Sequence, residues 1–559
     1  MSRGVAGNGS KQSSLRRWAS KRITGLSLEQ KVGQMVVVGF PGTECQAEIR
    51  HLLASCHIGG VMLTEGNIIS PAQTRSLVGQ LQKVSLESTG IQLFVSVDQE
   101  GGNVSRFRHP ATVLPTPMAI AATGSLESVE RCVRVSSREM RAMGINVNFA
   151  PVLDVNSDHS NPVIGVRSFG DSAEVVAEFG RVAIETCQRN GIIATAKHFP
   201  GHGDTCVDSH VALPTVRRSL EELRSIDLPP FEAAIKSHVE MVMTAHIVFP
   251  HLSDGDRPAT LSYDIVSGLL RESMGFEGII VTDALVMDAV ADRYDLEEAT
   301  IAAVEAGADL VLMLSTIENQ RSAYEGLLAA VKSGRLSEER IDQSALRILI
   351  AKRRLEIRES SSADLELGGW PIGDHEETVR DVARRAITLL RNRNRLLPIA
   401  ISAGERVGVI EFAKHRFSAV EDSRHYGCSL ASLVRARHPE TTSLVLDAIP
   451  ANGTASASQI VEQSDKIIIA TRNAHLVESQ ASLVRRLIAL GKPTAVVALR
   501  NPYDLMAFPE ADCHVAAYGD SPCLLVAVRD VLFGDHQPSG KLPVNLPGHY
   551  ERGYGRESY

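Results

Sequence analysis

The stretch Gly278-Ile279-Ile280-Val281-Thr282-Asp283-Ala284-Leu285 is a short β-branched run followed by the acidic residue Asp283 and two apolar residues. Such runs are typical of parallel strands, which are buried on both faces. Similar runs recur from residue 34 to residue 314, and each is followed by a polar or glycine-bearing turn and a longer helical pattern. The predicted strands are Gln34–Phe40, Ile58–Leu63, Leu93–Val97, Val147–Val152, Ile192–Ala196, Met241–Ala245, Gly278–Val281 and Asp309–Leu314.

This alternation of strands and helices favours an α/β protein with a (β/α)8 TIM-type barrel. An open doubly wound sheet would carry a glycine-rich phosphate-binding turn after its first strand, and the sequence has none there. Ser337, followed by Glu338 and Glu339, predicts the start of a helix that runs to about Arg354 and closes the barrel.

The rest of the chain predicts a second domain. Serine and glycine clusters and Pro371 indicate a linker over residues 355–375. Strand-like runs then alternate with helical segments, which favours a smaller three-layer α/β sandwich domain over residues 376–559. The catalytic barrel would span residues 23–354, and residues 1–22, which are basic and lack an acidic residue, would form a disordered tail.

Composition narrows the class of protein. The 559 residues carry a net charge of -8, so no basic surface for nucleic acid is expected. The 8 cysteines form no Cys-x-x-Cys pair, which fits free thiols in a reducing compartment. No apolar run is long enough for a secretory signal or a membrane helix. We therefore expect an intracellular, cytoplasmic protein without a membrane partner.

Polar residues at the ends of the predicted strands are candidates for function, because barrel enzymes place their active groups there. Asp283 could be a nucleophile, a general base or a salt-bridged structural carboxylate. Asp98 precedes Gly101 and Gly102, so it could accept bonds from substrate hydroxyls or belong to a solvated turn. Arg167, in the loop after the fourth strand, could hold a hydroxyl or a carboxylate.

The loop after the fifth strand, from Lys197 to His210, is dense in titratable residues. One interpretation is a zinc or manganese site, although the spacing matches no familiar ligand helix and Lys197 would bring a cation beside the metal. The other is a dyad in which Asp208 orients His210 for proton transfer to a leaving group and later from water.

Together these motifs resemble glycoside hydrolase family 3, and specifically its two-domain β-N-acetylglucosaminidase branch. The resemblance extends from about Leu26 to Pro547, and the segment from Lys197 to His210 is its most specific part. It implies that Asp283 is the nucleophile, His210 the acid/base and Asp208 its dyad partner. It also implies a set of residues that bind the non-reducing sugar, namely Asp98, Arg106, Arg167, Lys197 and His198.

The resemblance implies a retaining exo-β-N-acetylglucosaminidase that acts on terminal N-acetylglucosamine of a small carbohydrate substrate, with no cofactor and no metal. Cell-wall muropeptide fragments and chitin oligosaccharides are both candidate substrates. One alternative is a β-glucosidase or another β-glycosidase of the family. Others are a non-catalytic sugar-binding protein and a metal-dependent hydrolase using His198, His202, Asp204 and His210.

Overall fold

The computed structural model describes residues 5–209, 212–253, 255–360, 370–422, 426–447 and 451–559. The chain forms two compact units that are interleaved in sequence. The first, here called the barrel unit, consists of Met1–Gln99, Ser136–Asp154 and Ala183–Ile372. The second, here called the sandwich unit, consists of Glu100–Val135, Val155–Val182 and Gly373–Tyr559.

The barrel unit contains a closed barrel of parallel strands, in the order β1-β2-β3-β6-β7-β8-β9-β10, which confirms the predicted fold. Nearly every strand residue is buried, because helices cover the outer face and side chains fill the interior. This double burial explains why the strands appear in the sequence as unbroken apolar runs. The strands are β1 (Val36–Val38), β2 (Gly60–Leu63), β3 (Phe94–Val97), β6 (Val147–Asn148), β7 (Ile193–Phe199), β8 (Met241–Thr244), β9 (Ile279–Ala284) and β10 (Leu310–Met313).

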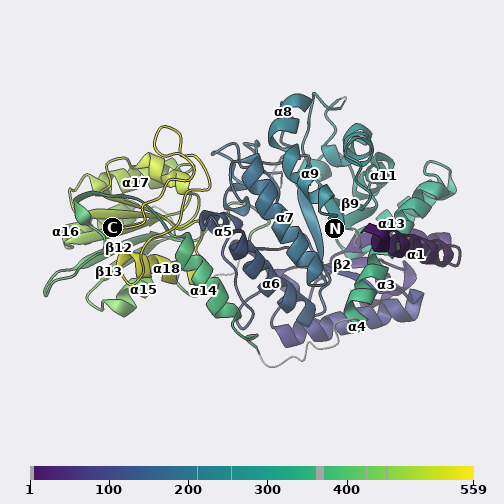
Figure 1. Cartoon of the computed structure of the whole chain (residues 1–559), viewed down its shortest axis with the longest axis horizontal. Coiled ribbons are helices and arrows are strands. Elements are labelled where there is room, and N and C mark those ends of the chain that lie inside the picture. Colours follow the sequence, from purple (N-terminus) through teal and green to yellow (C-terminus); the bar gives the residue numbers. More distant parts are fainter. Residues whose placement is uncertain (1–4, 210–211, 254, 361–369, 423–425, 448–450) are drawn as a thin grey trace. The chain divides into compact units, whose positions relative to one another are not determined.

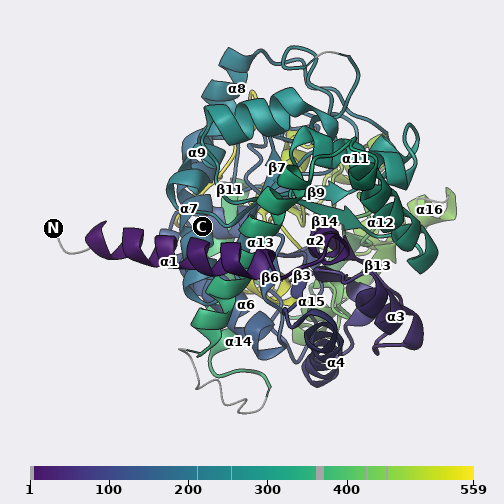
Figure 2. The ribbon, with the colours of Figure 1, turned by 90° about the vertical axis from the view of Figure 1, so that its right-hand side faces the viewer.

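Helices surround the barrel strands (Figure 2). They are α2 (Leu28–Gln34), α3 (Ala47–Ser55), α4 (Pro71–Thr89), α6 (Leu126–Ala142), α7 (Ala173–Arg189), α8 (Leu220–Ile226), α9 (Leu228–Lys236), the π-helix η4 (Asp264–Ser273), α10 (Asp288–Ala291), α11 (Leu296–Ala306), α12 (Ile317–Lys332) and α13 (Glu338–Ser360). Short 3-10 turns occur at η1 (Glu65–Asn67) and η3 (Ala259–Leu261). Helical segments between successive strands return the chain to the start of the next strand, as parallel pairing requires.

The amino-terminal segment differs from the expected disordered tail. Helix α1 spans Val5–Ile23, and its last turns pack on α13. Ala19 and Ile23, four residues apart on one helix face, are buried with Ala345 and Leu349. This apolar contact gives the helix a partner that the basic composition did not indicate. Residues 1–4 lie outside the described part.

Helix α13 begins where the sequence predicted. Ser337 caps it, because the Ser337 Oγ accepts a hydrogen bond from the Arg340 N–H at 3.1 Å. The helix continues to Ser360, beyond the predicted end near Arg354, and so extends into the predicted linker. Residues 361–369 of that linker lie outside the described part, and the domain ranges 23–354 and 376–559 stay a prediction.

The sandwich unit is built on a mixed sheet in the order β11-β16-β15-β14-β12-β13, in which β11 is antiparallel to β16 and the other neighbours are parallel. Its strands are β11 (Thr388–Asn392), β12 (Val407–Phe412), β13 (Thr442–Leu446), β14 (Lys466–Thr471), β15 (Thr494–Ala498) and β16 (Cys513–Ala516). A separate two-stranded sheet joins β4 (Gln99–Gly101) to β5 (Val104–Ser105).

Helices cover both faces of this sheet, so the predicted three-layer arrangement is confirmed. The connections β12 to β13 and β13 to β14 run in opposite directions across the sheet, and right-handed crossovers then place their helices on opposite faces. Figure 1 shows α17 on one face and α15 and α18 on the other. The helices are α5 (Pro117–Ala122), α14 (His375–Ala386), α15 (Leu430–Arg437), α16 (Ala451–Glu462), α17 (Glu478–Ile488) and α18 (Pro522–Leu532), with 3-10 turns η2 (Gly165–Arg167), η5 (Arg393–Arg395) and η6 (Pro502–Ala507).

Candidate active site

Asp283 lies near the carboxyl end of β9, where the buried strand Ile279–Thr282 gives way to a partly exposed side chain. The backbone N–H of Ala284 donates to its Oδ1 at 2.7 Å. On the other side, the Thr282 Oγ1 accepts from the Leu312 N–H at 3.0 Å and fastens the strand to β10. The carboxylate is therefore presented on a rigid strand with one oxygen held by a backbone donor.

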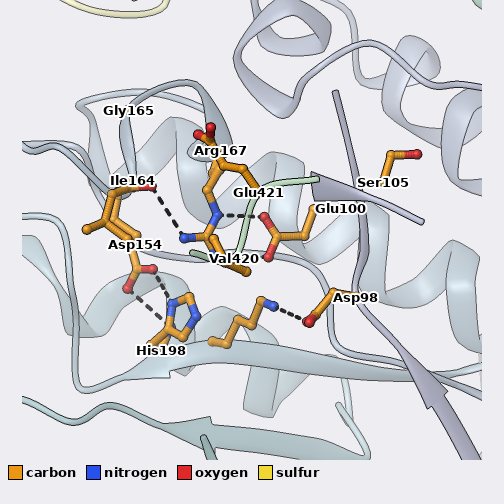
Figure 3. A network of polar contacts seen from close by, with 12 residues as sticks. Asp98, Glu100, Ser105, Asp154, Ile164, Gly165, Arg167, His198, Val420 and Glu421 are labelled. Atoms are coloured by element: carbon orange, nitrogen blue, oxygen red, sulfur yellow. Dashed lines mark hydrogen bonds and ion pairs between the residues drawn. The ribbon is translucent and has the colours of Figure 1, made fainter. Parts of the chain in front are cut away.

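Lys197 and Asp98 form a buried ion pair at the same end of the barrel unit. The Lys197 Nζ donates to the Asp98 Oδ1 at 2.8 Å (Figure 3). Lys197 belongs to β7 and Asp98 follows β3, so two separate strand ends supply the pair. Buried charges are stable only when they are paired, and such a pair can bind sugar hydroxyls without moving.

Asp154, a residue to which the sequence had assigned no role, organises two histidines. It is fully buried just after the fourth barrel strand. Its Oδ2 accepts from the His198 Nδ1 at 2.7 Å, and its Oδ1 accepts from the His198 backbone N–H at 3.1 Å (Figure 3). The Oδ1 also accepts from the backbone N–H of His202 at 2.8 Å. This set of bonds fixes the ring of His198 and the backbone that follows it.

The charge of Asp154 is stabilised by these contacts. Burial by itself raises the pKa of this carboxyl group, but the neighbouring His198 and His202 outweigh burial and hold the pKa below its usual value. Asp154 is thus an anion at neutral pH. Its position two residues after the predicted strand Val147–Val152 is the signal that could have identified it, because polar residues at strand ends were the search criterion.

The loop from His202 to Ser209 is held by its own side chains. The His202 Nδ1 contacts the Thr205 Oγ1 at 2.8 Å, and its Nε2 contacts the Ser209 Oγ at 3.1 Å. Further along, Arg218 donates to the Asp204 Oδ1 at 2.9 Å. The loop therefore has a defined path up to Ser209, in which His202 is a structural centre.

Asp208 is buried in this loop. The predicted acid/base His210 lies outside the described residues, so the Asp208–His210 dyad stays a prediction. Across the described ranges, no three His, Cys, Asp or Glu side chains are grouped as a metal site would need. Of the four candidate ligands in the metal alternative, His210 is the one outside those ranges.

Arg167 and Arg106 belong to the sandwich unit, where each meets a buried acid. The Arg167 Nε and Nη2 donate to the two oxygens of Glu100, both at 2.8 Å, in a bidentate pair (Figure 3). Arg106 lies 3.5 Å from the Asp422 Oδ1 and donates to the Val420 carbonyl at 2.9 Å. Both guanidinium groups are thereby oriented, which suits the sugar-binding role that was predicted for them.

Glu100 and Asp422 are partners of the candidate residues Arg167 and Arg106 that the sequence did not identify. Glu100 lies between the candidate residues Asp98 and Arg106 in the sequence, so its proximity to them could be read from the sequence. Asp422 accepts from the Ser105 N–H at 3.1 Å, although 317 positions separate the two residues. A contact over that separation leaves no local pattern, so only the folded chain reveals it.

None of the described helices combines the length and apolarity that a membrane crossing requires. All eight cysteines are free thiols, and Cys45, Cys56, Cys132, Cys187 and Cys513 are buried.

Comparisons with known proteins cover nearly the whole chain. The model of the Glycosyl hydrolase family 3 N terminal domain matches residues 27–351, and that of the C-terminal domain matches residues 387–558. The chain is 32% identical to beta-hexosaminidase A of Pseudoalteromonas piscicida over 93% of this chain and 97% of that protein. It is 29% identical to a beta-N-acetylglucosaminidase/beta-glucosidase of Cellulomonas fimi over 94% of this chain and 95% of that protein.

A solved structure is similar over the same extent. The glycoside hydrolase family 3 beta-N-acetylglucosaminidase from Paenibacillus sp. str. FPU-7 superposes with a TM-score of 0.88 at 38% sequence identity. The match covers 93% of this chain and 99% of that one.

Proposed function

Because this chain belongs to glycosyl hydrolase family 3 and is a glycoside hydrolase, we propose that Asp283 is the nucleophile of a retaining exo-β-N-acetylglucosaminidase. The observation that carries the proposal is the partly exposed carboxylate of Asp283 at the end of β9, with the Ala284 N–H on one of its oxygens. The hexosaminidase and N-acetylglucosaminidase names of the similar proteins support the choice of sugar.

In the first chemical step, the Asp283 Oδ2 attacks the anomeric carbon and the bond from that carbon to the leaving oxygen breaks. His210, in its cationic form, gives its proton to the departing oxygen. The product of this step is a glycosyl ester on Asp283, as expected for a retaining mechanism. A histidine here takes the place of the second carboxyl group that such enzymes usually carry.

In the second step, the neutral His210 removes a proton from water as the water oxygen attacks the anomeric carbon. The ester bond to Asp283 breaks, the sugar leaves with its original configuration, and His210 is again cationic. Asp208 orients the imidazole and stabilises its charge. An unperturbed imidazole titrates near pH 6.5, so one group can serve both steps close to neutral pH.

Sugar hydroxyl groups both donate and accept hydrogen bonds, and the residues proposed to bind the sugar include donors as well as an acceptor. The Lys197–Asp98 pair supplies an ammonium donor and a carboxylate acceptor, and His198 supplies a ring oriented by Asp154. Arg106 and Arg167 are assigned to the same sugar. The free thiols favour an intracellular location for this activity.

Replacing Asp283 by alanine tests the assignment directly. We expect kcat on a nitrophenyl N-acetylglucosaminide to fall by on the order of 10⁴-fold, because no ester can form. Asp292→Ala, an exposed carboxylate a few residues further on, is the matched control and keeps wild-type kcat. Wild-type turnover by the Asp283→Ala enzyme would show that the nucleophile is another residue.

A substrate panel separates the proposed sugar from the second candidate, which the double name of the Cellulomonas fimi relative favours. N-acetylglucosaminides should be cleaved with a higher kcat/KM than glucosides. The panel is repeated with a chelator present, which should leave the rates unchanged. A preference for glucosides would indicate a β-glucosidase, loss of rate with the chelator a metal-dependent hydrolase, and binding without turnover a sugar-binding protein.

A further inference from the structure

His246 is a buried histidine just beyond the carboxyl end of β8, the strand that pairs with β9. We propose that His246 is a positioning residue for the reaction, which holds the backbone beside Asp283 and thereby the direction of its carboxylate. This inference rests on the proposed role of Asp283 as nucleophile. It requires no contact between His246 and the sugar.

Ala284 is held at both of its backbone polar groups. Its N–H donates to the Asp283 Oδ1 at 2.7 Å, and its carbonyl oxygen lies 3.0 Å from the His246 Nε2. A carbonyl oxygen only accepts hydrogen bonds, so the His246 Nε2 carries the hydrogen and donates it. His246 therefore fixes the residue whose N–H orients the nucleophile.

The ring of His246 is itself locked in place from its other side. Its Nδ1 lies 2.9 Å from the Thr260 Oγ1. Thr260 belongs to the 3-10 turn η3 and also bonds the Thr244 Oγ1 at 3.0 Å and the Ala245 carbonyl at 2.9 Å. Both threonines are fully buried, so this set of bonds ties the end of β8 to the ring.

The strands on either side of β9 hold different parts of the segment around Asp283. Strand β10 holds the residues on either side of Asp283 and Ala284, through the bonds from the Leu312 N–H to the Thr282 Oγ1 and from the Leu285 N–H to the Leu312 carbonyl. The Ala284 carbonyl is instead held from the β8 side by His246. Loss of that bond would let Ala284 tilt while the strand stays paired.

Two substitutions distinguish this role from general packing. Glutamine places an amide N–H near the position of the imidazole Nε2, whereas asparagine reaches only the Nδ1 position. We expect His246→Asn to lower kcat about 10- to 100-fold with KM within about threefold, because a small displacement of a nucleophile slows chemistry more than binding. His246→Gln should recover most of kcat.

Controls keep the two proposals separate. His514 is also buried and also donates from Nε2 to a carbonyl, that of Phe508 at 2.8 Å, so His514→Asn should keep wild-type kcat per folded molecule. If the wild-type enzyme cleaves no glycoside, the proposed function fails. If it does cleave and His246→Asn keeps full kcat, or Gln and Asn lose kcat equally, the positioning role is overturned.

Thr260→Val provides a second route should His246→Asn not fold. This change keeps the side-chain shape and the histidine but removes the hydroxyl that orients the ring. The expected result is a loss of kcat of about 3- to 10-fold at constant KM, smaller than for His246→Asn because the Nε2 donor is still present. An unchanged kcat in a folded Thr260→Val enzyme would also contradict the positioning role.

Discussion

Asp154 shows how one buried carboxylate can organise two histidines of the candidate site. Its Oδ2 accepts the Nδ1 hydrogen of His198, which leaves the His198 Nε2 available for another partner. Its Oδ1 holds the backbone at His198 and at His202, where the loop to Ser209 begins. His198, which is predicted to bind the sugar, and the loop that is predicted to carry the dyad thus share one anchor.

Asp154→Asn is expected to lower kcat/KM about 10- to 100-fold. An amide group facing the His198 Nδ1 presents a hydrogen where the ring also presents one, so the imidazole must change tautomer or turn. Steady-state kinetics on a nitrophenyl N-acetylglucosaminide, with folding checked by circular dichroism, measures the effect.

Asp504 offers the matched control, because its Oδ1 makes the same two contacts with one histidine. It lies 2.7 Å from the His475 Nδ1 and accepts from the His475 N–H at 3.2 Å, within the sandwich unit. Asp504→Asn should leave kcat/KM near the wild-type value. Equal losses in the two variants would mean that Asp154 acts through stability alone.

At the scale of elements, strands that are buried on both faces were the most predictable part. All eight barrel strands fall on the predicted runs, because double burial requires continuous apolar sequence. Strands β11 and β13 were not predicted. Both lie at the edges of the sandwich sheet, where β13 is largely exposed and carries an apolar run of only three residues, Leu444 to Leu446.

The candidate site was predictable to the same extent as its strands. Asp283 and Asp98 were proposed because each follows a predicted strand, whereas the role proposed for Lys197 came from the family resemblance. Asp422 was missed because its partners are distant in sequence, and Asp154 was overlooked although it lies two residues after the predicted strand Val147–Val152. Whether Asp208 and His210 form the dyad stays a prediction.

Helix α13 fastens the amino ends of three barrel strands through Lys352, and this contact predicts a pH dependence of stability. The Lys352 Nζ donates to the Gln34 Oε1 and to the Gly59 carbonyl, both at 2.7 Å, and lies over the ring of Phe94. Burial lowers its pKa to about 7 from the usual 10.5. The folded protein therefore binds fewer protons than the unfolded chain between these values.

It follows that the contribution of Lys352 to the free energy of unfolding rises with pH, by up to about 1 kcal/mol per pH unit between about pH 7 and 10. Below that window both states are protonated and the buried charge is a constant cost. Denaturant unfolding at pH 7, 8, 9 and 10 should show the wild type gaining stability relative to Lys352→Met. Lys332→Met, at an exposed lysine, should show no such gain, and a flat difference for Lys352→Met would contradict the shift.

At the scale of the whole molecule, no single cleavage of the chain would separate the two units, because each consists of three separate stretches of sequence. The core of the sandwich unit includes Met118, Ala119, Ala122 and Val166, which precede most of the barrel in sequence. Its Arg106 and Arg108 pair with Asp422, from the last part of the chain. Residues before Ile372 therefore depend on residues after it.

A chain that ends at Ile372 is expected to aggregate or to bind a hydrophobic dye, and to lose activity, because those apolar side chains lose their core. Size-exclusion chromatography and dye fluorescence measure this. Co-expression with residues 373–559 should restore a folded, active protein. A monomeric and fully active 1–372 chain would contradict the dependence.

The interleaving also determines when the early segments of the sandwich unit can pack with its last segment during synthesis. The chain passes between the units at 99/100, 135/136, 154/155, 182/183 and 372/373. On the ribosome, the segments Glu100–Val135 and Val155–Val182 emerge early and wait until Gly373–Tyr559 is complete, roughly 20 to 80 s later at an elongation rate of about 5 to 20 residues per second. During that interval they are natural clients for chaperones, so the nascent chain needs more protection than its ordinary composition suggests.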